Sequence, residues 1–155
     1  FDQVRELMLE SMHPENRDAI QGDTDSEHVF QFLESMRRDR PDVERRRILR
    51  DGVRRIRDWA RDIDPKAEVA LNVLWIEREN LAGARFGRTL WLVERREPHV
   101  CEICGRPHAE PDPDEPYYAV EFASEQITSE DWREVPEDVV FDVGPDRDFD
   151  VVSVD

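Results

Sequence analysis

The sequence predicts an α+β fold in which helices come first and antiparallel strands follow. Apolar residues within the first 63 positions recur at helical spacing, whereas from residue 69 onward they form short runs rich in valine and aromatic residues. This change happens once, so the pattern does not favour alternating βαβ units. A chain of 155 residues is long enough to bury a single core, and it contains no internal repeat.

Three helices are expected before residue 65. The first covers residues 3–12, the second follows the stretch GDTDSE at 22–27 and stops before Pro41, and the third covers residues 42–63 and stops before Pro65. Proline disfavours the helical conformation in the residue before it, which accounts for the last two boundaries.

Strands are expected in the second half. Val69–Ile76 is an apolar run of the kind found in strands covered on both faces. Leu81–Phe86 and Thr89–Val93 flank Gly87-Arg88, which predicts a hairpin. The remaining strand candidates are Tyr117–Ala123, Val139–Val143 and Phe149–Val154. A loop of about two dozen residues precedes Tyr117, and loops of that length are usually functional or disordered.

The composition narrows the classes of partner. The chain has 38 acidic and 22 basic residues and a net charge of -16, which repels nucleic acid and anionic membranes. No run approaches the roughly 18 apolar residues of a membrane span, and the first residues lack the pattern of a signal peptide. We therefore expect a cytoplasmic protein that binds neither nucleic acid nor membranes. Lys66 is the only lysine, a bias that suits either a high-salt cytoplasm or a GC-rich genome.

The stretch GDTDSE combines a helix cap with a free carboxylate. Thr24 followed by Glu27 fits the capping box, in which each side chain bonds the backbone N–H of the other residue. This cap needs no contribution from Asp25. A carboxylate in the first helical turn is favoured by the helix dipole, which keeps it ionised. Asp25 is therefore suited to pair with an ammonium group of a ligand.

Five segments in order carry a family resemblance. They are Ile20–Glu27 (IQGDTDSE), Ala70–Leu74 (ALNVL), Leu81–Gly87 (LAGARFG), Ala123–Thr128 (ASEQIT) and Trp132–Pro136 (WREVP). Together they resemble the second half of class II glutamine amidotransferase domains, most closely the small stand-alone members. The resemblance covers nearly the whole chain, so residues 1–155 are expected to be the C-terminal portion of one such domain.

The resemblance implies part of an N-terminal-nucleophile hydrolase, an αββα sandwich of two antiparallel sheets between helical layers. In that family an N-terminal cysteine attacks the side-chain amide of glutamine, its own α-amino group acts as base, and a thioester is hydrolysed with release of ammonia. No cofactor takes part in this catalysis. The resemblance assigns Asp25 to the α-ammonium group of glutamine or a γ-glutamyl compound. It places the backbone of Gly22 and the hydroxyl of Thr24 at the same pocket.

Several functional residues of the family are missing from this chain. The nucleophilic cysteine, the arginine that meets the substrate carboxylate and the Asn-Gly of the oxyanion hole all lie upstream of the matching region. Cys101 and Cys104 are internal and cannot replace an N-terminal nucleophile. We therefore expect no catalysis by this chain alone, and we expect the missing half to be another segment or another chain.

A cysteine and histidine cluster lies in the loop at about 96–116. His99, Cys101, Cys104 and His108 fall within ten residues, and together they would complete a tetrahedral structural zinc site. A metal would order a loop that has no core of its own. The two cysteines could also bind metal with water or a partner's ligand, form a local disulfide, or have no role. The alternative function is thus a non-catalytic zinc-stabilised interaction module on the same scaffold.

His28 and the arginines of the third helix are interpreted as structural residues and not as parts of a binding site. His28 is expected on a solvated helix surface, although it follows Thr24 by one turn. The arginines of the third helix, Arg45-Arg46-Arg47 and Arg54-Arg55, are expected to pair with local carboxylates instead of nucleic acid.

Overall fold

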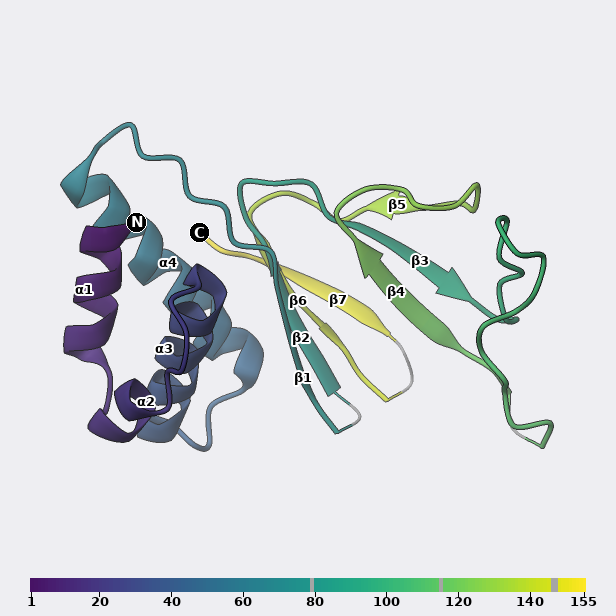
Figure 1. The fold of residues 1–155 in the computed structure, drawn as a ribbon, viewed down its shortest axis with the longest axis horizontal. Coiled ribbons are helices and arrows are strands. Elements are labelled where there is room, and N and C mark those ends of the chain that lie inside the picture. The colour runs from purple at the N-terminus through teal and green to yellow at the C-terminus, as the bar shows by residue number, and fades with distance from the viewer. Residues whose placement is uncertain (79, 115, 146–147) are drawn as a thin grey trace.

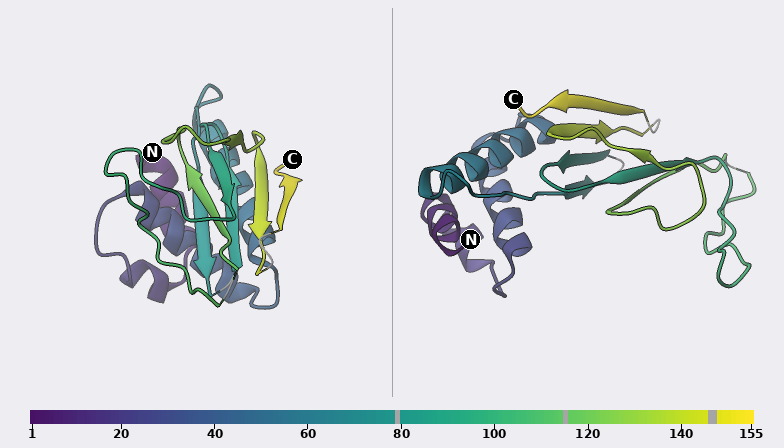
Figure 2. Two further views of the ribbon diagram at one scale, coloured as in Figure 1. Left: turned by 90° about the vertical axis from the view of Figure 1, so that its right-hand side faces the viewer. Right: turned by 90° about the horizontal axis from the view of Figure 1, so that it is seen from above.

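The computed structural model describes residues 1–78, 80–114, 116–145 and 148–155. Helices occupy one end of the molecule, a four-stranded sheet follows, and a three-stranded sheet lies farthest from the helices (Figures 1 and 2). The predicted α+β fold, with helices first and antiparallel strands after, is confirmed.

The helices are α1 (Asp2–Ser11), α2 (Pro14–Asp18), α3 (Asp25–Asp39) and α4 (Arg45–Ile63). Three of them match the predicted helices, whereas α2 was not predicted. It begins at Pro14, whose fixed φ suits the first position of a helix. Helix α4 packs on β2 and β6 of the four-stranded sheet, and α1 and α3 pack on α4. None of the described helices is both long and apolar enough to cross a membrane.

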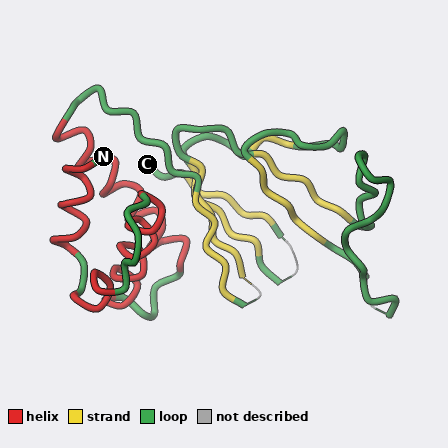
Figure 3. The backbone as a smooth tube through the Cα atoms, viewed as in Figure 1, coloured by secondary structure: helices red, strands yellow, loops and turns green. Residues whose placement is uncertain are grey.

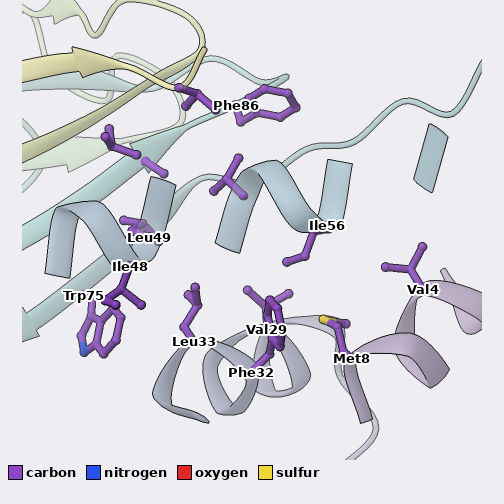
Figure 4. Close-up of a cluster of buried hydrophobic side chains, with 14 of the residues drawn as sticks. Val4, Met8, Val29, Phe32, Leu33, Ile48, Leu49, Ile56, Trp75 and Phe86 are labelled. Atoms are coloured by element: carbon purple, nitrogen blue, oxygen red, sulfur yellow. The ribbon is translucent and has the colours of Figure 1, made fainter. Parts of the chain in front are cut away.

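The helical spacing of apolar residues produces the first core, which lies between the helices and the four-stranded sheet (Figure 4). Helix α3 contributes Phe32 and Leu33, which are 1% and 2% exposed, and α4 contributes the fully buried Ile48 and Leu49. The sheet contributes Trp75 from β1. Burying a side chain of this size contributes about 1.5–3 kcal/mol. The core therefore fixes α3, and with it the residues at its N-terminus.

All strand pairs are antiparallel and form two sheets (Figure 3). The first has the order β1-β2-β6-β7 and the second the order β4-β3-β5. The strand bounds are β1 Val73–Glu77, β2 Asn80–Arg85, β3 Trp91–Arg95, β4 Ala119–Ala123, β5 Arg133–Glu134, β6 Val139–Val143 and β7 Phe149–Ser153.

The predicted hairpin between β2 and β3 is wrong, because these strands belong to different sheets. Gly87 has a φ of 72°, and a Cβ there would lie 2.1 Å from the carbonyl oxygen of Val69. The backbone N–H of Leu71 donates to the carbonyl of Phe86 at 2.8 Å. The turn thus packs against the segment before β1 and carries the chain from one sheet to the other. Strand β2 instead pairs with β1, the strand before it, and with β6.

The expectation that Val69–Ile76 is a strand covered on both faces is also wrong. Strand β1 begins at Val73 and lies at an edge of its sheet. Leu74 and Ile76 are 42% and 66% exposed, because the second sheet packs against β2 and β6 and does not reach this edge. Only the opposite face of β1 is covered, where Trp75 meets the helices.

A second core lies between the two sheets. Phe141 of β6 is fully buried, with its ring centroid 5.1 Å from Phe122 of β4 and 5.2 Å from Phe149 of β7. Leu92 of β3 is also fully buried in this cluster. These aromatic contacts connect β4 of the second sheet to β6 of the first.

The prediction that arginines of α4 pair with local carboxylates is confirmed for Arg45 and Arg46, whose partners lie in the first sheet. Arg45 meets Glu77, and Arg46 meets Asp150 and lies 2.9 Å from Asp142. These arginines are therefore engaged inside the molecule and do not form a free basic surface.

Candidate functional site

The N-terminus of α3 is held by a cap that differs in part from the predicted capping box. The Thr24 hydroxyl accepts from the backbone N–H of Glu27 at 3.4 Å, as predicted. The Glu27 carboxylate instead reaches farther back and accepts from the N–H groups of Gln21 and Gly22, both at 2.8 Å. These two bonds lower the pKa of Glu27. A Cβ on Gly22 would lie 2.9 Å from this carboxylate, so glycine permits the close approach.

His28 completes this cap, and the prediction that it is solvated is wrong. The side chain is only 5% exposed, and its Nδ1 lies 2.8 Å from the carbonyl oxygen of Thr24. An Nδ1–H group there donates a hydrogen bond to this carbonyl, which lies one helical turn before His28. The four-residue spacing from Thr24 was visible in the sequence, but it did not reveal that the side chain turns inward.

Asp25 is the first residue of α3 and keeps an available carboxylate. Its side chain is 66% exposed, and Arg5 of α1 lies nearby, with Nη2 3.6 Å from Asp25 Oδ1. The same guanidinium donates to the carbonyl of Asp23 at 3.3 Å. Asp25 is thus held between a helix N-terminus and one arginine. Sequence reasoning missed Arg5, because no local pattern connects α1 to the start of α3.

Asp25 borders a cavity of about 910 Å³ between α1, α3, α4 and the segment 64–75. Phe1, Phe30 and Leu71 contribute apolar lining. The lining also includes four acidic side chains, Asp2, Asp25, Asp64 and Glu68. No lysine or arginine lines it among the described residues, so the cavity favours a ligand that carries a positive charge.

The cavity can bind a ligand but holds little reactive chemistry. Ser26 supplies a hydroxyl, while no cysteine, histidine or lysine belongs to its lining in the part of the chain that the structure describes. Of the three residues that the family resemblance assigned to the substrate pocket, only Asp25 lines this cavity. Gly22 and Thr24 act one step away, in the cap that positions Asp25.

The cysteine and histidine cluster lies at the other end of the molecule, in the loop between β3 and β4 (Figure 1). Ligand atoms of Cys101, Cys104 and His108 all fall within 4.8 Å of one another. The fourth predicted ligand, His99, faces Glu130, with Nδ1 3.2 Å from Oε2. The structure thus brings together three of the four residues singled out in the sequence.

Comparisons with known proteins establish the fold. No family model matches the sequence, and no curated protein matches it. Among solved structures, a glutamine aminotransferase class-II domain protein from Silicibacter pomeroyi has a similar structure, with a TM-score of 0.67 and 17% sequence identity. The alignment covers 99% of this chain and 62% of that protein. The chain therefore shares its fold with a glutamine aminotransferase class-II domain protein, of which it spans less than two thirds.

Proposed function

We propose that residues 1–155 are the C-terminal portion of a class II glutamine amidotransferase-like domain. The complete domain hydrolyses the side-chain amide of glutamine or a γ-glutamyl compound in the cytoplasm. The observation that carries this proposal is Asp25, a capped and exposed carboxylate at an acidic cavity on a matching fold. The complete domain is an αββα sandwich. Helices α1–α4 form one helical layer of this sandwich, and a segment outside these residues supplies the other.

Asp25 binds the α-ammonium group of the substrate. The acidic lining favours a cation at this position, and a charge-assisted hydrogen bond contributes about 1.5–3 kcal/mol. Thr24 and Gly22 have positioning roles: the Thr24 hydroxyl starts the helix, and the Gly22 N–H anchors Glu27. A rigid cap is what allows one carboxylate to hold an ammonium group in a fixed direction.

The nucleophilic cysteine comes from a segment or chain outside these residues. Two features of the cavity support the proposal that another segment binds there. Phe1 and Phe30 line the cavity and are 48% and 47% exposed, so apolar surface is available for another segment to cover. Strand β1 also lies at a sheet edge beside the cavity, where an added strand can pair with it. The catalytic steps need no cofactor.

The test uses the natural full-length protein and Asp25→Asn. This change keeps the shape of the side chain and removes its charge, so the KM for glutamine should rise about 10- to 100-fold. The turnover number should change less, because the lost contact holds substrate and transition state alike. Asp23→Asn is the matched control, since it removes the same charge from a residue that does not line the cavity. An unchanged KM in Asp25→Asn would refute the assignment.

The second candidate is a non-catalytic, zinc-stabilised interaction module on the same scaffold. The grouping of Cys101, Cys104 and His108 favours it, because these residues serve no step of glutamine hydrolysis. The residues before Phe1 separate the two candidates. A chain that begins Met-Cys and carries Asn-Gly shortly before Phe1 supports the enzyme, whereas full-length protein that releases no ammonia from glutamine supports the module.

A further inference from the structure

The segment from Val100 to His108 is already folded into the shape of a metal-binding knuckle. Val100 pairs with Pro107 in an antiparallel bridge, and the Cys101 N–H donates to the carbonyl of Arg106 at 3.0 Å. The Gly105 N–H donates to the carbonyl of Cys101 at 2.8 Å. Gly105 has a φ of 69°, the left-handed region that favours glycine. The reversal therefore places both cysteines and His108 on one small loop.

The donor atoms of this knuckle are close to the spacing that zinc requires. Cys104 Sγ lies 3.0 Å from His108 Nε2, and all three ligand atoms fall within 4.8 Å. With Zn–S bonds of ~2.3 Å, the edge of a zinc tetrahedron is about 3.8 Å. A small rearrangement of this exposed loop would bring the three atoms to a common ion.

The backbone around Cys101 also fixes the position of its sulfur. The N–H groups of Cys104 and Ile103 donate to this sulfur. Thiolate and imidazole ligands together suit zinc better than magnesium or calcium, which prefer oxygen.

His99 has another partner. Its Nδ1 faces Glu130, which also binds Arg95 of β3 at 2.6 Å, and the His99 side chain is only 19% exposed. Glu102 is engaged as well, because its carboxylate accepts from the backbone N–H of Ser129 at 2.8 Å. These contacts fasten the base of the knuckle to the loop before β5. They leave Cys101, Cys104 and His108 as the ligand set.

We propose that Cys101, Cys104 and His108 bind one Zn²⁺ ion with three protein ligands and leave the fourth position to exchangeable water. Structural zinc sites usually have four protein ligands, so this site differs from a closed knuckle. Cys104 and His108 are exposed, and solvent reaches the open position. A small imidazole or thiol molecule can therefore replace the water. The proposal is independent of glutamine hydrolysis.

The test measures Co²⁺ binding to the reduced full-length protein by visible absorption. One equivalent should bind, with sulfur-to-metal charge-transfer bands that Cys101→Ser reduces by about half, since the site has two thiolates. His108→Ala should weaken binding by more than about 100-fold, because loss of residues that merely support ligands already costs 10- to 100-fold. His99→Ala is the matched control and should bind Co²⁺ as the natural protein does.

The open position has its own test. Added imidazole should shift the visible bands of the Co²⁺ protein, because it replaces the bound water. Three results would overturn the proposal: absence of stoichiometric binding, equal losses in His99→Ala and His108→Ala, or a spectrum that imidazole does not change. His99 is the competing ligand in the second result, because its buried Nε2 has no hydrogen-bond partner among the described residues. Far-UV circular dichroism of each variant confirms that the fold is retained.

Discussion

Gly83→Ala tests the packing of the two sheets. Gly83 of β2 lies opposite Phe141 of β6, and an added Cβ would sit 2.1 Å from Phe141 Cζ and 2.3 Å from Cε2. Carbon atoms in contact prefer about 3.5–4.0 Å, so the ring would have to move by roughly 1.5 Å. It has little room to do so, because it packs against both Phe122 and Phe149.

The expected cost is that of overpacking a core, about 1–3 kcal/mol in the free energy of unfolding. For a chain of this length, each kcal/mol lowers Tm by about 2–4 °C, so Tm should fall by about 2–12 °C. Urea and thermal unfolding followed by circular dichroism measure both quantities. Gly144→Ala is the matched control, because a Cβ there meets no described atom within 4 Å.

A further variant identifies the ring as the cause of the loss. Gly83→Ala combined with Phe141→Leu should cost less than the sum of the two single changes, because the smaller side chain makes room for the methyl group. The reasoning fails if Gly83→Ala is as stable as Gly144→Ala, or if the two changes simply add.

Three other changes test the cap, an ion pair and the connection between the sheets. Thr24→Ala should lower the free energy of unfolding by about 1 kcal/mol in urea, and Thr24→Ser should restore most of it, because serine is also a good N-cap. Hydrogen bonding by Arg95 holds the pKa of Glu130 in the folded protein below its ordinary value of 4.5. The ionised carboxylate therefore stabilises the fold above about pH 4.5, and this stabilisation is lost as the pH falls through the lower pKa of the folded state. Glu130→Gln should therefore be less stable at neutral pH and lose less stability on acidification; an identical acid limb in pH-dependent unfolding would contradict this. Gly87→Ala should lower Tm, since the added Cβ meets the Val69 carbonyl and the φ is positive, and a Tm equal to that of the natural protein would contradict the close approach.

The helices were predictable because their signals are local. Apolar spacing and a proline after each of the last two helices were enough to place α3 and α4 within a few residues. The fold class followed from the single change of pattern near residue 69. The pairing of β2 was not predictable in the same way, because Gly87 looks like a hairpin turn and only its contact with Val69 shows otherwise.

The candidate site was predictable only in part, for the same reason. Asp25 stood out because a good helix cap does not need it. Its neighbour Arg5 and the opposing wall at 64–75 come from distant segments, and no spacing in the sequence connects them. In the metal cluster, proximity along the chain suggested four ligands, but it did not reveal that Glu130 lies against His99.

The most direct test of the central claim compares glutamine with 4-carbamoylbutanoate, the same molecule without its α-ammonium group. In the full-length protein, ammonia release should give a kcat/KM about 10- to 100-fold higher for glutamine, the ratio that one charge-assisted contact supports. In Asp25→Asn this preference should largely disappear, because the carboxylate that recognises the ammonium group is gone. A preference for glutamine that is the same in the natural protein and in Asp25→Asn would contradict the account.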